Sequence, residues 1–442
     1  MPAAAFPWDG RAPLIVLVRP RSAAGNYAAA ELECTRCSMS RMSLDLLFIG
    51  ALPPLPGGAP ISMAGLLVEL ARRGHRIRAV APITVAERGR GAAFRAAHPE
   101  LNVHWFIVPS FEIATGIPPS EEYRESEGVA LRRAVQPLVA ARSPDVVMIG
   151  RESFASHVPQ LARAWRRPCV LLARGNPTRL IIDGLYPPVQ AEQFIAQFRS
   201  VDLIVAVATH LEEGLRRLGL AHVLTIPNAV DLDVFAPRPR SAELAHALGI
   251  SPDATVVLHA SNMSPLKRPL DLLRAVAHLR TSLPRLVCVV VGDGPLRRLV
   301  DETGDELGLS RVLRFTGWVS HERMPELISV ADLVAMPSAA EGLARVYLEA
   351  QACGRVLVAS DIPAAREVVT HGRTGLLFRS GDHENLAAQL ASAATDPDLR
   401  EEIGRQARHY VAQRHDLQQM VSAYEGVLTD VSRRRAHPVG TP

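Results

Sequence analysis

Apolar runs alternate with amphipathic segments along this chain in two successive sets. In the first set the strand-like runs lie at 44–52, 76–82, 102–109, 145–150, 169–174, 203–208 and 223–226. In the second set they lie at 255–260, 285–291, 312–316, 331–336, 355–360 and 374–378, with helical patterns at 267–280, 295–307, 322–329 and 343–353. This alternation is typical of parallel α/β domains. We therefore expect an α/β protein with two Rossmann-like domains whose parallel sheets face each other across a cleft.

The same pattern predicts where the domains begin and end. Turn residues interrupt both periods at 227–241, which we interpret as a hinge between an N-terminal domain at 42–226 and a C-terminal domain at 242–410. The last periodic segment carries no strand, so we expect a helix at 411–432 that returns to the first domain, followed by a tail at 433–442. Residues 1–41 lack periodicity and are expected to form a disordered extension, unless translation starts at Met39 or Met42.

Composition and charge exclude several classes of protein. The 49 Lys and Arg are interspersed with 45 Asp and Glu, so no long basic block indicates a nucleic-acid partner. No apolar stretch approaches the roughly 18 residues that span a bilayer, and no signal peptide is recognisable. The scattered cysteines, with a lone Cys34/Cys37 pair, indicate a reducing compartment and no zinc site. We expect a cytoplasmic protein; peripheral contact with the inner face of the membrane and the oligomeric state stay open.

The segment from Glu341 to Gly354 carries the strongest chemical signal. It follows a predicted strand and opens a predicted helix, whose first amides at Gly342 to Arg345 would bind a diphosphate. Glu341 and Glu349 would flank that diphosphate about 12 Å apart along the helix, where they could bind the hexose and the ribose of a donor. In isolation, two such glutamates are more often exposed helix charges.

Taken with its flanks, this segment resembles the donor-site motif of the family-4 retaining glycosyltransferases, in which seven residues separate two glutamates. Further similarities follow in the family's order, at 226–231, 291–295, 315–319, 356–361, 367–369 and 372–377. The resemblance implies the GT-B fold and transfer of a glycosyl (hexosyl) unit from a nucleoside diphosphate sugar to a hydroxyl acceptor, with retention. It also implies that neither a metal ion nor a cofactor is required, and that the nucleotide sugar is a substrate.

The family usually places an arginine and a lysine in a turn near the start of the second domain. Lys267 matches the lysine, but Asn262 stands where the arginine is usual, so one phosphate-neutralising charge is missing. A similar turn occurs in the branch that makes N-acetylglucosaminyl malate for bacillithiol, so the change need not abolish activity. In the first domain, Gly57 and Gly58 resemble the family's glycine loop, which lets backbone amides approach a phosphate or the sugar.

The resemblance assigns roles to particular residues. Glu341 and Lys267 are expected to be catalytic, with Glu341 orienting the sugar, while Glu349 binds the ribose and the backbone around Val319 binds the base. The expected donor-binding residues are Gly57, Gly58, Asn262, Ser264, Lys267, Arg268, Val319, Glu341, Gly342, Leu343, Ala344 and Glu349.

On the acceptor side the sequence departs from the family, because histidines are absent from two strand ends where many members carry them. Arg151, Glu152 and Arg174 occupy these ends and are candidates for contact with an anionic acceptor, a reading balanced evenly against structural ion pairing. The least patterned loops, 110–130 and 176–192, are the expected acceptor contacts. His75 is expected to cap a helix end and His157 to lie on a helix surface.

Two alternatives stay open. The missing arginine and histidines are compatible with a non-catalytic partner protein that has kept the GT-B fold. A nucleotide-sugar epimerase or a phosphorylase would share the architecture, although the motifs of neither are present. Two Asp-x-Asp pairs, Asp231 with Asp233 and Asp396 with Asp398, lie away from the donor segment, so no metal site is expected there.

Overall fold

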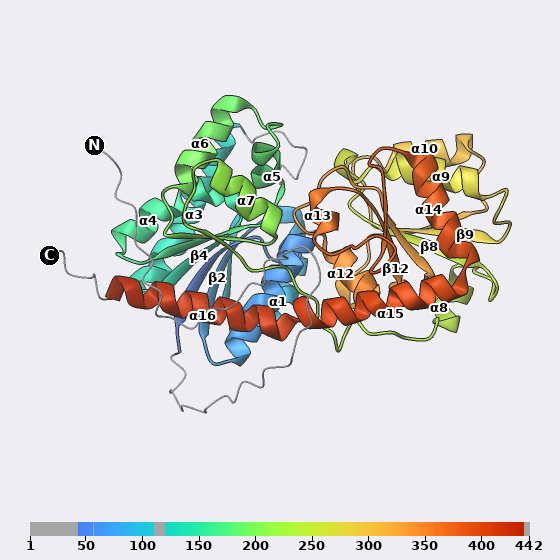
Figure 1. The fold of residues 1–442 in the computed structure, drawn as a ribbon. Coiled ribbons are helices and arrows are strands. Elements are labelled where there is room, and N and C mark those ends of the chain that lie inside the picture. Colours follow the sequence, from blue (N-terminus) through green and yellow to red (C-terminus); the bar gives the residue numbers. More distant parts are fainter. Residues whose placement is uncertain (1–42, 56, 110–119, 437–442) are drawn as a thin grey trace, which may run out of the picture. The chain divides into compact units, whose positions relative to one another are not determined.

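The computed structural model describes residues 43–55, 57–109 and 120–436, and its fold is drawn in Figure 1. The predicted extension at 1–41, the Cys34/Cys37 pair and residues 110–119 of the predicted acceptor loop at 110–130 lie outside the described residues.

The first half contains a seven-stranded sheet in which every neighbouring pair is parallel. Its strand order is β3-β2-β1-β4-β5-β6-β7. Strand residues are buried almost throughout, because helices flank the sheet and leave little of it open to water (Figure 1). The strands are β1 (Asp45–Gly50), β2 (Arg76–Ile83), β3 (Val103–Ile107), β4 (Val146–Gly150), β5 (Cys169–Ala173), β6 (Leu203–Ala206) and β7 (Val223–Thr225).

The second half contains a six-stranded parallel sheet with the order β10-β9-β8-β11-β12-β13. Its strands are β8 (Thr255–Ala260), β9 (Leu286–Val291), β10 (Leu313–Gly317), β11 (Leu333–Met336), β12 (Val356–Ser360) and β13 (Leu376–Phe378). Two parallel sheets of this kind confirm the predicted α/β class with two Rossmann-like halves.

Helices connect the strands in both halves. In the first half they are α1 (Gly58–Arg72), α2 (Arg88–Ala97), α3 (Glu121–Ala141), α4 (Val158–Ala164), α5 (Asn176–Ile182), α6 (Pro188–Phe198) and α7 (Thr209–Arg217). In the second half they are α8 (Ala242–Ala247), α9 (Pro269–Leu279), α10 (Arg297–Glu306), α11 (Met324–Val330), α12 (Arg345–Ala352), α13 (Pro363–Arg366) and α14 (His383–Thr395), followed by α15 (Pro397–Arg414) and α16 (Leu417–Ala436). None of the helices that the structure describes has the length and apolar character of a membrane span.

Two details of the predicted elements were wrong. The donor helix α12 begins at Arg345 and not near Gly342, so Glu349 lies one turn into the helix instead of two. The predicted helix at 411–432 is interrupted, because the chain breaks at His415 and Asp416 between α15 and α16. Several predicted strands are also a residue or more too long at their ends, where the chain leaves the ladder of hydrogen bonds.

The break between α15 and α16 lies beside the segment around Val230, which also connects the two halves. Val230 and Asp416 form a parallel bridge, with Val230 N donating to His415 O at 2.9 Å and Leu417 N donating to Val230 O at 3.1 Å. The His415 imidazole also bonds to the backbone oxygen of Asn228 at 2.9 Å. The connections between the two halves therefore lie side by side and are tied together.

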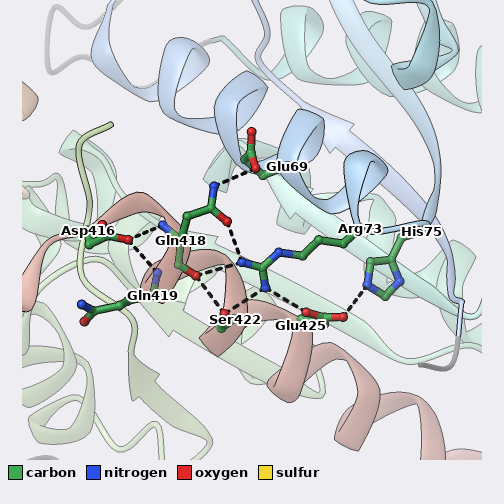
Figure 2. A network of polar contacts seen from close by, with 8 residues as sticks. All are labelled: Glu69, Arg73, His75, Asp416, Gln418, Gln419, Ser422 and Glu425. Atoms are coloured by element: carbon green, nitrogen blue, oxygen red, sulfur yellow. Dashed lines mark hydrogen bonds and ion pairs between the residues drawn. The ribbon is translucent and has the colours of Figure 1, made fainter. Parts of the chain in front are cut away.

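Beyond this break, α16 packs on the first half, where Met420, Val421, Tyr424 and Leu428 join the buried cluster that contains β1 and α1. This location confirms that the terminal helix returns to the first half. A polar network fixes the contact at its edge (Figure 2), where the Arg73 guanidinium donates to Glu425 Oε2 and to Ser422 Oγ, both at 2.9 Å.

The network also reaches Gln418, which receives two hydrogen bonds from Arg73 and donates to Glu69 at 2.8 Å (Figure 2). His75 follows α1, is buried, and links β1 to α16: its Nδ1 accepts from Leu44 N at 3.1 Å and its Nε2 donates to Glu425 Oε1 at 3.3 Å. Burial would raise the pKa of Glu425, but the hydrogen bonds from Arg73 and His75 outweigh it and hold the pKa below its usual value.

Candidate active site

The carboxyl ends of the central strands define where ligands bind in open parallel sheets. The strand order reverses between β1 and β4 in the first sheet, and between β8 and β11 in the second. Asn262 and Lys267 follow β8, and Glu341 and Gly342 follow β11, so the predicted donor residues lie at the switch point of the second sheet.

The turn after β8 is fixed by hydrogen bonds to His259, which is fully buried at the end of that strand. Burial lowers the pKa of His259 to about 4, so its imidazole is neutral near pH 7. Its Nδ1 donates to Ala335 O on β11 at 2.9 Å, and its Nε2 accepts from Ser261 Oγ at 2.8 Å. Ser261 Oγ in turn accepts from Met263 N at 3.1 Å. A neutral histidine thus positions the first residues of the donor turn.

The turn also requires two glycines from the loop after β9. A Cβ added to Gly292 would lie 2.0 Å from Ser261 O, and one added to Gly294 would lie 1.7 Å from Asn262 O. Either contact is far inside van der Waals distance, and Gly292 has in addition a φ of +110°. These approaches explain physically why Val291-Gly-Asp-Gly-Pro295 has glycine at both positions.

Lys267 and Glu341 meet across the switch point. Lys267 Nζ donates to Glu341 Oε1 at 2.5 Å, and Glu341 is 7% exposed. Lys267 is the only lysine of the 442-residue chain, in which every other one of the 49 Lys and Arg is an arginine. An ammonium is a compact point charge suited to a phosphate oxygen, whereas a guanidinium is a planar fork. The composition therefore singles out this position.

Glu349 lies in α12 and is almost completely buried, at 3% exposure. Its Oε1 accepts from Arg345 Nε at 3.1 Å and lies 2.9 Å from His321 Nε2, which Arg345 Nη2 also approaches at 3.0 Å. Burial by itself would raise the pKa of Glu349, but the hydrogen bonds and charges of His321 and Arg345 outweigh burial and lower it. Glu349 is therefore an ionised hydrogen-bond acceptor whose position one turn into α12 is fixed by its partners.

The glycine loop of the first half touches the donor helix. A Cβ at Gly58 would lie 3.3 Å from Cδ of Arg345, so the side chain that binds Glu349 also packs against the start of α1. Gly57 has a φ of +115°, a conformation that favours glycine. The predicted glycine loop and donor helix thus lie in contact.

A second contact between the halves runs through Gly342 and Asn228. A Cβ at Gly342 would lie 2.4 Å from Arg174 O at the end of β5, so only glycine fits there. The Asn228 amide nitrogen donates to Leu343 O at 2.9 Å, while its Oδ1 accepts from Ser62 Oγ and Arg174 Nη1 at 3.3 and 3.0 Å. Asn228 therefore joins α1, β5 and the loop that precedes α12.

The remaining donor candidates divide into two groups. Asn262 lies in the donor turn with a buried Oδ1 that no described residue bonds, Ser264 O accepts from Lys267 N, and Ala344 caps α12. Val319 follows β10 and is half-buried, beside the exposed Trp318. Arg268, by contrast, pairs with the buried Asp271 of α9 at 2.6 Å, so its charge is already matched within that helix.

The structure separates the three acceptor-side candidates. Arg151 pairs with the buried Glu127 at 2.8 Å and stacks on Phe154, which is a structural ion pair. Glu152 Oε1 accepts from the backbone nitrogens of Arg174 and Gly175 at 2.9 and 2.7 Å, so it fixes the turn between β5 and α5. Arg174 has no ion-pair partner among the residues that the structure describes.

His157 is not a helix-surface residue, and that expectation was wrong. It precedes α4, is half-buried, and its Nε2 donates to Arg124 O at 3.0 Å. The ring fills the space over Gly128, where a Cβ would lie 2.6 Å from it.

Both Asp-x-Asp pairs bind backbone. Asp231 Oδ1 accepts from the nitrogens of Asp233 and Val234, and Asp396 Oδ1 accepts from Leu399 N at the start of α15. Within the described ranges, one group of side chains could share a metal ion, namely His278, His383 and Glu384. It lies at the end of α9 remote from the donor turn.

Four residues of the site were missed in the sequence analysis: His321, Arg345, His259 and Asn228. Asn228 and Arg345 stand within segments that resembled the family, so their position was a usable signal. His321 and His259 gave none, because a single histidine in an apolar strand or a short turn has no spacing that identifies its partner.

Two family descriptions match the chain. "Glycosyl transferases group 1" matches residues 241–410, and "Glycosyltransferase Family 4" matches residues 56–234. The chain is also similar to a D-inositol 3-phosphate glycosyltransferase of Saccharomonospora viridis, with 37% identity over 85% of this chain and 89% of that protein.

Other matches are shorter or more distant. A D-inositol 3-phosphate glycosyltransferase of Kribbella flavida is 36% identical over 42% of this chain and 46% of that protein. An N-acetyl-alpha-D-glucosaminyl L-malate synthase of Bacillus anthracis is 30% identical over 52% of this chain and 60% of its own length. The alignments thus span about half the length of these two relatives.

Among solved structures, Anabaena HepE in complex with UDP and glucose superposes with a TM-score of 0.73 at 21% identity, covering 87% of this chain and 100% of that one. At this identity the likeness shows the fold, which is the GT-B arrangement expected from the sequence. The two family descriptions cover both halves of the chain, and the match to the Saccharomonospora protein covers most of it. The chain therefore belongs to the family-4 glycosyltransferases.

Proposed function

We propose that this protein transfers a glycosyl unit from a nucleoside diphosphate sugar to a hydroxyl group of an acceptor, with retention at the anomeric carbon. The observation that carries the proposal is the Lys267–Glu341 pair at the switch point of the second sheet. Relatives named as glycosyltransferases, and HepE solved with UDP and glucose, support the same reaction class.

The groups of the site suit departure of a diphosphate. When a donor enters, a phosphate oxygen can replace Glu341 as the partner of Lys267, which frees the Glu341 carboxylate to accept from a sugar hydroxyl. The first amides of α12 and the Lys267 ammonium would then stabilise the negative charge that develops on the leaving diphosphate. No metal ion is required, because these amides and the ammonium meet the diphosphate charge, and no protein base is required, because the leaving phosphate can take the acceptor proton.

Glu349 is prepared for the ribose. Its pKa is held low, and its Oε1 is occupied by His321 and Arg345, so Oε2 can accept from ribose hydroxyls without a change of charge. Arg345 also brings a positive charge to the first turn of α12. This charge is paired with Glu349, so it does not replace the one lost where Asn262 stands in place of an arginine.

Calorimetric titration with UDP, GDP and ADP tests the donor site. We expect one of them to bind, and both Lys267→Ala and Glu349→Ala to weaken that binding by about tenfold or more, because each removes a charged hydrogen bond. Arg298→Ala, which removes an exposed positive charge on α10, should leave affinity unchanged. Unchanged affinity in both site variants would refute the donor assignment.

Turnover distinguishes the proposal from the alternatives. Glu341→Ala should lower the transfer rate more than it lowers affinity for the bare nucleoside diphosphate, because its proposed partner is the sugar. A non-catalytic protein with this fold would bind the nucleotide but show no donor turnover with any acceptor. An epimerase would isomerise the donor sugar in the absence of an acceptor.

A further inference from the structure

Arg174 is a buried arginine whose charge is not matched. It lies at the end of β5 and is 8% exposed. Its Nη1 donates to Ser62 Oγ at 2.8 Å and to Asn228 Oδ1 at 3.0 Å, which are both neutral groups. Its Nε and Nη2 are buried and have no hydrogen-bond partner among the described residues. The guanidinium therefore presents one edge to the protein and leaves the three N–H groups of Nε and Nη2 unused.

Such an arrangement is costly unless something else completes it. Buried charges in proteins are normally paired, and a buried donor without a partner loses its hydration without compensation. The nearby Glu152 does not provide the pairing, because its Oε1 accepts from the backbone nitrogens of Arg174 and Gly175 and from Thr178 Oγ1. No ion pair with Arg174 occurs in the part of the chain that the structure describes.

The position of Arg174 connects it to the reacting groups. Its backbone oxygen lies against Gly342, where a Cβ would come within 2.4 Å. Its guanidinium bonds to Asn228, which donates to Leu343 O. Glu341, Gly342 and Leu343 form the loop in which the proposed function places the transferred sugar. The Arg174 backbone therefore packs against that loop, and the Arg174 guanidinium is linked to it by hydrogen bonds through Asn228.

We propose that Nε and Nη2 of Arg174 bind a carboxylate or phosphate group carried by a substrate, in addition to the diphosphate of the donor. This inference rests on the proposed function and specifies that one of the two substrates carries a further anionic group. Two parallel N–H donors on one side of a guanidinium match two oxygens of a carboxylate or phosphate. Both nitrogens are shielded from solvent in the present arrangement, so the side chain or the Gly342 loop must shift when the ligand enters.

The anionic group has two sources, and the experiment separates them. In the donor arm, calorimetry compares UDP-glucose with UDP-glucuronate. In the acceptor arm, protein saturated with a nucleoside diphosphate is titrated with inositol 3-phosphate against inositol, and with malate against glycerol. We expect the wild type to bind the charged member more tightly in one arm, and Arg174→Gln to reduce that preference by about 30-fold.

Controls separate binding from folding. Arg163→Gln removes an exposed positive charge from the same half and should keep the preference. Arg174→Gln retains an amide that can donate to Asn228, so its thermal midpoint should stay close to that of the wild type. A purely structural arginine would instead give a clear loss of thermal stability and no change in the ratio of affinities.

Three results decide the matter. No preference for the charged member in either arm, or a preference that survives in Arg174→Gln, would overturn the inference. If a nucleoside diphosphate binds and the charged substrates are not favoured, the inference alone fails. If no nucleoside diphosphate binds at all, the proposed function has failed as well.

Discussion

His259 makes the second half of this protein sensitive to acid. The pKa of its imidazole falls from 6.5 to about 4 on burial. Because the folded pKa is the lower one, the unfolded chain binds a proton that the folded chain does not. The stability associated with His259 is therefore complete above pH 6.5 and is lost as the pH falls toward 4. With these two values, linkage gives a loss of about 2 kcal/mol at about pH 5.

Urea unfolding of the wild type and of His259→Asn at about pH 7 and about pH 5 measures this effect. Asparagine keeps a donor for Ala335 O but does not titrate, so the variant should lose about 2 kcal/mol less than the wild type over this range. Other histidines are present in both proteins and cancel in the difference. His246→Asn, an exposed histidine on α8, should behave like the wild type. An identical pH dependence in wild type and His259→Asn would refute the reasoning.

Three further predictions follow from the contacts. Gly342→Ala places a methyl group 2.4 Å from Arg174 O, so we expect the free energy of unfolding in urea to fall by about 1–3 kcal/mol and the transfer rate to fall as well. The control Gly65→Ala, with open space around it, should raise the free energy of unfolding by about 0.5–1 kcal/mol, and the reverse order of stabilities would contradict the packing. Glu425→Gln should cost about 1 kcal/mol near neutral pH, and this difference should vanish as the pH falls below about 4.5, because the wild-type pKa is lowered. Glu401→Gln, at an exposed position of α15, is the control, and a constant difference for Glu425→Gln would contradict the assignment. Activity should survive EDTA, since amides and an ammonium meet the diphosphate charge, and its full loss with recovery in magnesium or manganese would contradict the proposed mechanism.

Periodicity predicted the sheets well because central strands are buried on both faces and therefore have continuous apolar runs in the sequence. It failed at the donor helix, because a loop held by contacts distant in sequence looks like the first turn of a helix. Gly342 does not continue the helix pattern of α12: it lies where β5 approaches through Arg174 O. Sequence patterns within a single segment cannot predict this contact, because Arg174 and Gly342 are far apart in the chain.

The candidate site divides in the same way. Lys267 and the two glutamates were found because a strand, a turn and a helix place them at one sheet edge. The sorting of Arg151, Glu152 and Arg174 was beyond the sequence, since it depends on partners such as Glu127, which is 24 residues from Arg151, and Ser62, which is 112 residues from Arg174. Pairing at such separations decides whether a charge is structural or available.

The single lysine allows the central claim to be tested directly. If Lys267 binds the diphosphate of the donor, a saturating nucleoside diphosphate should hold its ammonium form and block access to it, so acetylation of the deprotonated amine by an amine-reactive ester should slow markedly. The chain's N-terminal amine, which serves as the internal reference, should react as before. Peptide mass spectrometry reports both sites in the same sample. Protection of Lys267 by that nucleotide is the expected result. Equal acetylation of Lys267 with and without bound nucleotide would contradict it.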